Sequence, residues 1–143
     1  MTAPEPAEHL IPLLKHTLGG LSAAIDGALA PHGIDGREFA VLRTFAGSTP
    51  RSQQEAAHDL QVDRTTMVAL VDALEAKDLV ERRRDPHDRR RNVVEPTAAG
   101  RRTLRAAGTA ARRAEQRFLA PLDADAVAQL RTTLHTLVTR PSD

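Results

Sequence analysis

Apolar side chains return every third or fourth residue along both ends of this chain. In the first 30 residues they are Leu10, Leu14, Leu18, Leu21, Ile25 and Leu29. After residue 97 they are Leu104, Ala107, Ala111, Ala114 and Phe118, and then Val127, Leu130, Leu134 and Leu137. This period is typical of an α-helix with one apolar face. It predicts three long helices, which begin between Pro6 and Pro12, at Thr97 and at Asp123.

Three shorter helices are predicted between the long ones, each introduced by a capping side chain. The expected caps are Asp35, Ser52 and Asp63, and a Glu follows the first two caps at the spacing of a capping box. The third helix is expected from Arg64 to about Lys77. A turn of only three residues, 61–63, joins the last two helices, so this segment predicts a helix-turn-helix.

The next segment is rich in arginine and reads as a hairpin. Its two short arms, 82–84 and 89–91, carry six arginines between them. The four residues Asp85–Asp88 fit a type I turn, because Asp suits the first position and Pro presets φ at the second. So much like charge opposes folding unless a polyanion compensates it, and guanidinium groups fit phosphate and narrow minor grooves. The hairpin therefore indicates nucleic-acid binding; the alternative is a solvated surface hairpin.

A helix-turn-helix followed by a two-stranded ribbon is a winged helix. The predicted fold class is mainly α with a small β-wing, a winged helix-turn-helix plus a helical dimerisation region. We expect one integrated domain with three parts: an N-terminal dimerisation helix (1–34), a winged DNA-binding region (35–96) and C-terminal dimerisation helices (97–143). The small winged core can cover only part of the apolar stripes on the terminal helices, so a second copy of the chain is expected to cover the rest.

Composition excludes several classes of protein. The chain has 143 residues, a formal net charge of +1 and no cysteine, which rules out disulfides and thiolate metal sites. No apolar run reaches the roughly 20 residues of a membrane span. Residues 1–9 carry acids and prolines instead of the basic start of a signal peptide. We therefore expect a cytoplasmic protein that does not enter a membrane.

Two segments resemble the MarR family of bacterial transcription regulators. Segment Asp88–Gly100 is similar to the family's wing motif, Asp-x-Arg, then a short β-strand, then Leu-Thr-x-x-Gly. Segment Val62–Glu75 looks like the family's recognition helix, and the resemblance extends over about residues 8–138. Pro96 stands where the family usually has Leu, which predicts a second wing strand that ends one residue early. Val68 and Ala69 stand where many members have polar or basic residues.

The resemblance implies a homodimer that reads palindromic double-stranded DNA, and we expect it to act as a repressor. It also implies a pocket between the dimer helices and the winged lobes, which often takes a small aromatic or phenolic effector. No cofactor is implied. Binding of the effector is expected to release the DNA.

The expected DNA contacts come from three elements. The recognition helix supplies Arg64, Thr65, Thr66 and Val68. The start of the preceding helix supplies Ser52, Gln53 and Gln54, because free amides at a helix N-terminus bind phosphate. The wing supplies Arg82, Arg84, Asp88, Arg89, Arg90 and Arg91.

Alternative roles remain open at several of these positions. Thr65 and Thr66 are alternatively helix-capping residues, and Val68 is alternatively a core contact. For Arg82, Arg84 and Arg91 the choice is between phosphate contacts and a solvated face. The resemblance suggests that one arginine at the wing tip pairs with Asp88. We expect Arg90 to pair and Arg89 to enter the minor groove.

Nothing in the sequence predicts catalysis or a metal site. The histidines form no His-x-x-x-His or His-Glu pattern, and there is no Gly-rich phosphate loop. His9 and His16 lie on one helical face and are weak candidates for lining the effector pocket or the dimer seam. The alternative function is a winged-helix module that binds protein or RNA without an operator, but the deep, narrow major groove of RNA would exclude the recognition helix.

Overall fold

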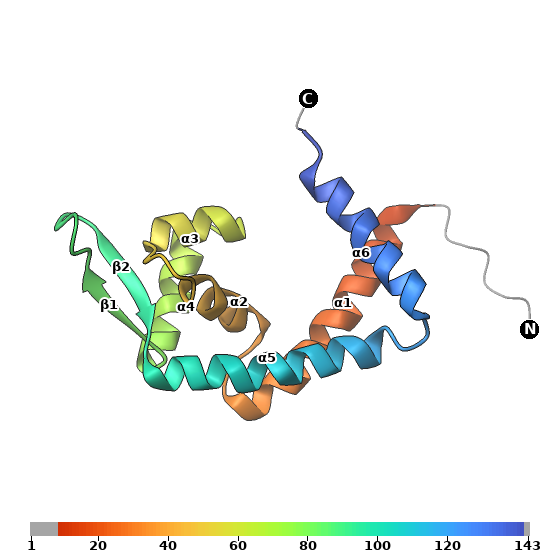
Figure 1. Cartoon of the computed structure of the whole chain (residues 1–143), viewed down its shortest axis with the longest axis horizontal. Coiled ribbons are helices and arrows are strands. Elements are labelled where there is room, and N and C mark those ends of the chain that lie inside the picture. The colour runs from red at the N-terminus through yellow and green to blue at the C-terminus, as the bar shows by residue number, and fades with distance from the viewer. Residues whose placement is uncertain (1–8, 142–143) are drawn as a thin grey trace, which may run out of the picture.

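The computed structural model describes residues 9–141. In chain order the elements are α1 (Leu10–Leu29), the short 3-10 helix η1 (Ala30–His32), α2 (Gly36–Phe45), α3 (Gln53–Leu60), α4 (Arg64–Ala76), β1 (Val80–Arg84), β2 (Asn92–Pro96), α5 (Ala98–Phe118) and α6 (Ala124–Thr139). Figure 1 shows a winged lobe built from α2, α3, α4 and the two strands, and an arm built from α1 and α6, with α5 running between them. The predicted fold class is confirmed.

Capping side chains begin the helices where the sequence places them. The Asp35 carboxylate accepts from the Glu38 N–H at 2.8 Å, and the Glu38 carboxylate accepts from the Asp35 N–H at 3.2 Å, which completes a capping box. Ser52 Oγ accepts from the Glu55 N–H at 3.2 Å, but the Glu55 carboxylate accepts from the Ser52 hydroxyl instead of its N–H. Local sequence therefore fixes the start of each helix of the winged lobe.

The core of the winged lobe is aliphatic. Its largest fully buried side chains include Phe45, Leu42, Met67 and Leu74 from α2 and α4. Gly100 in the first turn of α5 packs so closely on β1 that a Cβ there would collide with the carbonyl oxygen of Leu79. This close approach explains why a glycine stands at the end of the wing motif and ties α5 to the base of the wing.

The wing is an antiparallel ladder from Val80↔Pro96 to Arg84↔Asn92. The expectation that β2 ends before Pro96 is wrong. The Thr97 N–H donates to the Leu79 carbonyl at 3.0 Å, so the neighbouring Val80↔Pro96 pair is one of the pairs that exchange no backbone hydrogen bonds. A proline at such a position gives up no ladder bond, and the strand can continue through it.

The tip of the wing also differs from the prediction. The hydrogen-bonded turn is Asp88–Arg91, closed by the Arg91 N–H and the Asp88 carbonyl at 3.0 Å, and not Asp85–Asp88. Asp85 is instead paired across the ladder with Arg91 at 2.8 Å. The Asp85 carboxylate accepts from the His87 N–H and the Asp88 carboxylate from the Arg90 N–H, so two aspartates shape the loop. Residues 89–91 therefore form the tip instead of a strand arm.

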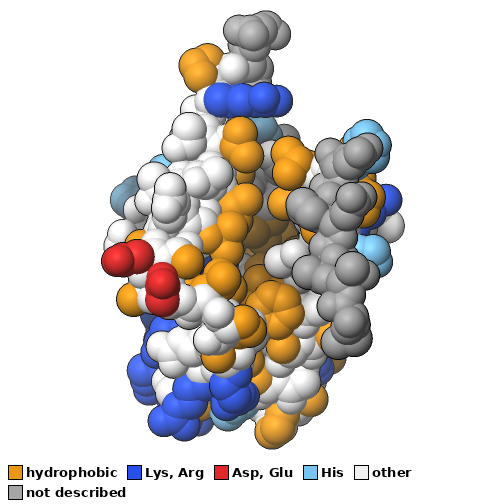
Figure 2. Space-filling view, turned by 90° about the vertical axis from the view of Figure 1, so that its right-hand side faces the viewer, with side chains coloured by type: hydrophobic (Ala, Val, Ile, Leu, Met, Phe, Trp, Pro, Cys, Tyr) orange, Lys and Arg blue, Asp and Glu red, His pale blue; other side chains and the backbone are white. Residues whose placement is uncertain are grey.

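Apolar side chains lie uncovered on the arm. Figure 2 shows them gathered in a hollowed band on the side of the molecule where α1 and α6 lie. The exposed large ones are Leu10, Ile11, Leu13, Leu14, Leu18, Leu122, Leu134, Leu137 and Val138. α6 buries none of its residues and α1 buries only Leu29. Within residues 9–141, no surface covers these exposed parts of the apolar stripes.

Candidate nucleic-acid interface

The first turn of α4 is held by its cap and exposes its polar side chains. The Asp63 carboxylate accepts from the Thr66 N–H at 2.7 Å. The pKa of Asp63 lies below its usual 3.8, first because of this backbone hydrogen bond and next because the Thr66 hydroxyl also binds the carboxylate. Thr66 is thus engaged in the cap, in agreement with its alternative role. Arg64 and Thr65 are exposed.

Val68 and Ala69 occupy the outward side of α4. Ala69 is exposed, and Val68 is half-buried. Val68 is not part of the apolar cluster that Met67 and Val71 form with the rest of the core. The alternative role of Val68 as a core contact is therefore not supported, and its side chain is available to an apolar surface such as a thymine methyl group.

A polar hollow of about 770 Å³ lies where α3, α4 and the wing meet. It is lined by Ser52, Gln53, Gln54, Glu55, His58, Asp59, Arg64, Arg82, Arg90, Arg91 and Asn92. Seven of the expected DNA contacts, from three separate elements, therefore share one concave surface. Thr65, Thr66, Val68, Arg84, Asp88 and Arg89 lie outside its lining.

Arg82 is tied into the protein and is not a free phosphate contact. Its guanidinium donates to Asp72 at 2.6 Å and Glu75 at 2.8 Å on α4, and to the Gln53 side chain at 2.7 Å on α3. Only 26% of the side chain is exposed. The expectation that Arg82 contacts phosphate or solvent is corrected: its donors are used to fasten β1 to both helices. It also neutralises the negative charge of these two carboxylates.

Arg91 is similarly engaged. Its guanidinium pairs with Glu55 of α3 and lies 3.6 Å from the Asp85 carboxylate. No ion pair within residues 9–141 joins Asp88 to the side chain of Arg89 or Arg90. The expected Arg90–Asp88 side-chain pair is therefore wrong, because Asp88 holds the tip through the backbone N–H of Arg90.

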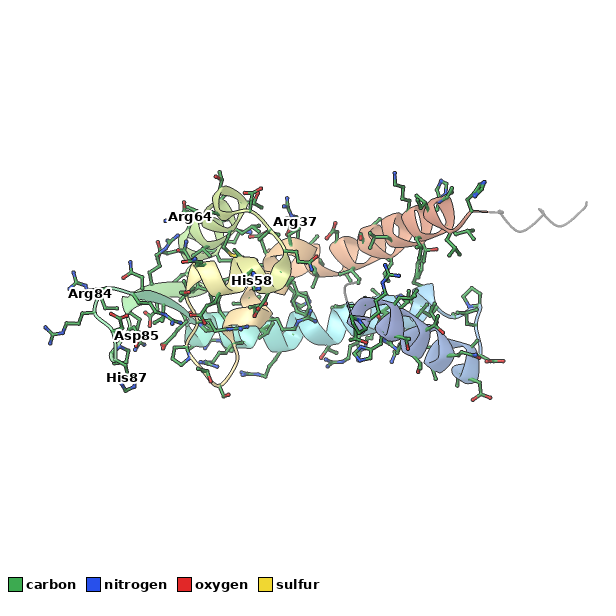
Figure 3. All side chains as sticks on the ribbon, turned by 90° about the horizontal axis from the view of Figure 1, so that it is seen from above. Arg37, His58, Arg64, Arg84, Asp85 and His87 are labelled. Carbon is green, nitrogen blue, oxygen red and sulfur yellow. The ribbon has the colours of Figure 1, made fainter. Side chains whose placement is uncertain are left out.

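The remaining wing cations divide into one paired and three unpaired residues. Arg83 bonds to Glu81 at 2.9 Å and lies 3.0 Å from Glu95, and these two carboxylates, Glu81 first, raise the pKa of its guanidinium. Arg84, Arg89 and Arg90 are exposed and have no ion-pair partner among the described residues. Figure 3 shows the wing projecting from the lobe, with Arg84 and His87 near its tip.

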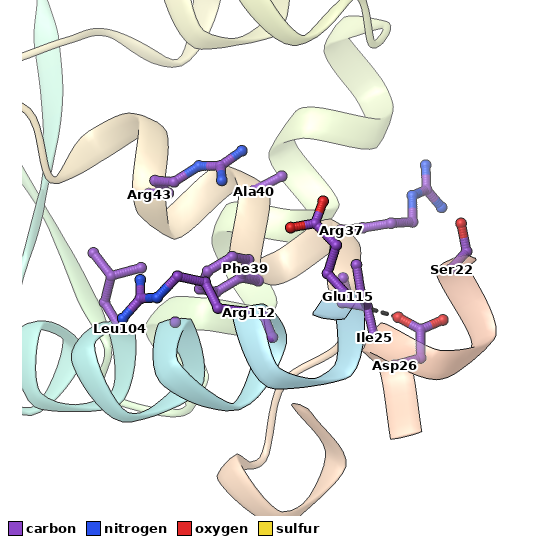
Figure 4. Close-up of a pocket in the computed structure, with 13 residues that line it drawn as sticks. Ser22, Ile25, Asp26, Arg37, Phe39, Ala40, Arg43, Leu104, Arg112 and Glu115 are labelled. Carbon is purple, nitrogen blue, oxygen red and sulfur yellow. Dashed lines mark hydrogen bonds between the residues drawn. The ribbon is translucent and has the colours of Figure 1, made fainter. Parts of the chain in front are cut away.

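A second hollow, of about 700 Å³, lies between α1, α2 and α5. Figure 4 shows Arg37 and Arg43 from α2, and Arg112 from α5, around it. The Arg43 guanidinium lies 5.5 Å from the centre of the Phe39 ring, and none of the three arginines has an acidic partner among the described ion pairs. This hollow thus combines unpaired cations with an aromatic ring.

The resemblance predicts a pocket between the long terminal helices and the winged lobe, where this hollow lies, but the residues that line it were not predicted. His9, the exposed residue before α1, and His16, in the exposed first half of α1, do not line it. Its lining residues come from three helices, and each arginine reads in the sequence as part of a solvated helix face. The sequence holds no local signal for them, because the apolar positions Ile25, Phe39 and Leu104 belong to helical stripes and are seen to be partly exposed only in the folded chain.

Within residues 9–141, no three His, Asp or Glu side chains are grouped so that they could hold a metal ion. None of the helices in that range has both the length and the apolar character needed to cross a membrane.

Comparisons with known proteins agree with this geometry. Residues 32–91 match the model of the MarR family. The transcriptional repressor CouR, solved bound to a 23-mer DNA duplex, superposes with a TM-score of 0.86 and 32% identity, over 96% of this chain and 98% of that chain. The chain belongs to the MarR family of transcription regulators.

Other relatives place the chain among the same regulators. A MarR-family regulator from Rhodococcus sp. RHA1 has a TM-score of 0.84 and 29% identity, over 96% of this chain and 97% of that one. The curated repressor NicR of Pseudomonas putida is 33% identical over 87 residues. That match spans 61% of this chain and 55% of NicR.

Proposed function

We propose that this MarR-family chain is a homodimeric repressor that binds palindromic double-stranded DNA. The observation that carries the proposal is the concave surface where the starts of α3 and α4 meet the wing. Exposed helix N-termini and arginines on one surface match the shape and charge of a duplex backbone.

In this arrangement α4 enters the major groove with its first turns nearest the bases. Arg64 bonds to guanine or phosphate, Thr65 to phosphate or a base edge, and Val68 contacts a thymine methyl group. Ser52, Gln53 and Gln54 hold a phosphate at the start of α3. Arg89 enters the minor groove, and Arg84 and Arg90 contact the phosphates beside it.

The dimer is proposed from the exposed apolar band on α1 and α6. A two-fold dimer carries two recognition helices, and it therefore reads half-sites whose centres lie about one helical turn apart. Analytical ultracentrifugation at micromolar concentration tests the assembly. A stable monomer would contradict both the dimer and the palindrome.

DNA binding is tested by selecting fragments of genomic DNA with the purified protein. The expected result is an enriched palindrome, bound with a log–log salt slope of roughly −5 to −9. Competition with double-stranded RNA serves as a control, because a recognition helix does not fit its major groove. A flat salt response, or equal competition by RNA, would contradict the proposal.

The hollow between α1, α2 and α5 is the proposed effector site. CouR from Rhodococcus jostii RHA1, with 29% identity and a TM-score of 0.83, has been solved bound to p-coumaroyl-CoA. In this chain the unpaired Arg37, Arg43 and Arg112 beside Phe39 suit an effector with an aromatic body and negative charge. Such a ligand releases DNA only if it binds the form with incompatible helix spacing more tightly.

A screen of aromatic carboxylates and their CoA thioesters tests this part. The expected hit weakens duplex binding while the dimer stays intact, and Arg112→Gln weakens its effect. If no compound in either class changes duplex binding, the protein is a regulator without an effector of this kind.

A further inference from the structure

Lys77, at the end of α4, makes the link that joins the recognition helix to α2. Its ammonium group donates to the Glu38 carboxylate at 2.6 Å and to the Gly33 carbonyl at 2.8 Å. The Glu38 side chain is only 9% exposed, and Glu38 is the buried charged residue of the described chain. A buried carboxylate with a single cation is a contact that resists small displacements, because separating the pair leaves a charge without compensation.

The other end of this link reaches the hollow between α1, α2 and α5. Glu38 closes the capping box at the start of α2, and Gly36, the first residue of that helix, donates its N–H to Asp26 at 2.7 Å. Asp26 and Gly36 both line the hollow, and Figure 4 draws the bond between Asp26 and α2 as a dashed line. The start of α2 is thus held by Asp26 from the hollow and by Lys77 from α4.

Lys77 is poorly placed to contact DNA itself. It follows the last residue of the 13-residue α4, whose first turn carries Arg64, so about 20 Å of helix separates the two ends. The hollow's own cations, Arg37, Arg43 and Arg112, do not contact Glu38 in the described hydrogen bonds and ion pairs. Within residues 9–141, Lys77–Glu38 is the ion pair that joins α2 to the end of α4, whereas Arg37 of α2 acts on the α4 cap Asp63 only through a longer-range charge interaction.

We propose that Lys77 is a positioning residue that couples the hollow to the recognition helix through Glu38 and the Gly36–Asp26 bond. A negatively charged ligand in the hollow repels the Asp26 carboxylate from Gly36 and so shifts the start of α2, and Lys77 passes this shift to α4. The proposal rests on the proposed function, in which α4 reads DNA. It goes further by naming the contact through which the occupied hollow changes DNA binding.

A double-mutant cycle tests the link without any effector. Asp26→Ala, Lys77→Met and the double variant are compared with the natural protein by duplex affinity, using the fragment that the natural protein selects. Asp26 and Lys77 make no direct contact, so effects of independent sites would multiply. If the link is present, the double variant binds the duplex no more weakly than Lys77→Met alone. Its loss of affinity is then smaller, by at least about threefold, than the product of the two single losses. Multiplicative effects would overturn the proposal.

Two variants guard against loss of folding. Lys77→Met leaves Glu38 buried without its cation, so the cycle is repeated with Glu38→Gln/Lys77→Met, in which the amide keeps the cap. Gly36→Ala replaces Asp26→Ala in a further cycle, since a Cβ there would lie 2.8 Å from the Asp26 carboxylate oxygen and would displace it. Thermal unfolding of each variant shows that it is folded under the binding conditions.

The matched control pairs Asp26→Ala with Arg83→Met. Arg83 is also an ion-paired cation, but its partners Glu81 and Glu95 lie within the wing, so its effect is expected to multiply with that of Asp26→Ala. Lys77→Met should also leave the salt slope unchanged, whereas loss of a phosphate contact reduces it by about one. A reduced slope for Lys77→Met, or coupling in the control cycle, would overturn the link. Failure of the natural protein to bind any duplex would overturn the proposed function as well.

Discussion

The wing and the exposed side of α5 (the α5 face, which borders the second hollow at Arg112) each carry six arginines, but the two regions use them differently. In the wing, Arg82, Arg83 and Arg91 are paired with acids, which leaves Arg84, Arg89 and Arg90 unpaired. On α5 all six are exposed, and none has an acidic partner among the described ion pairs: Arg101, Arg102, Arg105, Arg112, Arg113 and Arg117. The α5 face is therefore the more cationic of the two by count.

In the proposed mode of DNA binding, position reverses that ranking. In Figure 3, α5 runs along the edge of the winged lobe opposite the edge where Arg64 lies. The wing extends beyond α4. Acidic side chains hold its strands and its tip in place by accepting hydrogen bonds from Arg82 and from the Arg90 backbone. The comparison teaches that the number of arginines in a segment does not locate an interface. The location of the interface depends on which arginines are held by ion pairs and on the side of the fold where the other arginines lie.

Removing the unpaired wing arginines should have the largest effect. For Arg84→Ala/Arg89→Ala/Arg90→Ala we expect duplex affinity to fall by about 100-fold and the salt slope to become shallower by about 3 or more, because several phosphate contacts per dimer are lost. Fluorescence anisotropy across a salt series measures both quantities. An unchanged slope would show that these residues do not face phosphate.

Arg82→Ala should give a smaller loss of a different kind. It breaks the bonds to Asp72, Glu75 and Gln53, so we expect affinity to fall by about tenfold and the free energy of unfolding to fall by about 1–2 kcal/mol, with little change of salt slope. Denaturant unfolding and salt-dependent binding measure the two effects. Arg84→Ala is the matched control: it should reduce the slope and leave stability within about 0.5 kcal/mol. The opposite pattern would return Arg82 to the DNA contacts.

Low pH should weaken the cap of the recognition helix. The pKa of Asp63 is depressed in the folded protein, so its carboxylate stabilises the fold above the ordinary value of 3.8, and this contribution is lost as pH falls through the folded pKa. We expect the natural protein to be more stable than Asp63→Ala by a constant amount above about pH 5. The difference should shrink below that. Unfolding curves from pH 2 to 7 measure it, and a difference independent of pH would contradict the role of the ionised carboxylate.

The α5 face should show the smallest effect. For Arg101→Gln/Arg102→Gln/Arg105→Gln we expect operator affinity to change by less than about threefold, since only weak, screened long-range attraction is lost. These residues lie in the part of α5 nearest the winged lobe, away from the apolar band. A loss as large as that of the wing variant would erase the distinction between the two basic regions.

Local features of the fold were predictable from the sequence. The caps Asp35, Ser52 and Asp63 start their helices as expected, because a capping side chain bonds to amides only a few residues away. The winged helix was predictable from the helical period and the order of the elements, because the period also depends only on residues close together in the chain. Within the wing, the arm predicted at 82–84 lies in β1, but the arm predicted at 89–91 precedes β2, because two Asx hydrogen bonds move the turn three residues along the chain.

The candidate site was predictable in outline only. The residue types at the starts of α3 and α4 and in the wing indicated a DNA surface, and the structure brings seven of them to one hollow. The role of Arg82 was not predictable, because its partners Gln53 and Asp72 are 29 and 10 residues away along the chain. The residues that line the second hollow were not predictable for the same reason, since they come from three helices.

By itself, then, the sequence determined where each helix begins, that an arginine-rich hairpin follows a helix-turn-helix, and that the terminal helices carry uncovered apolar stripes. Only the tertiary structure decided which arginines are free, which residues wall the two hollows, and that Lys77 holds Glu38 across two helices. The physical reason is range. Capping and periodicity act within a few residues, whereas ion pairs and cavities depend on side chains that only the folded chain brings together.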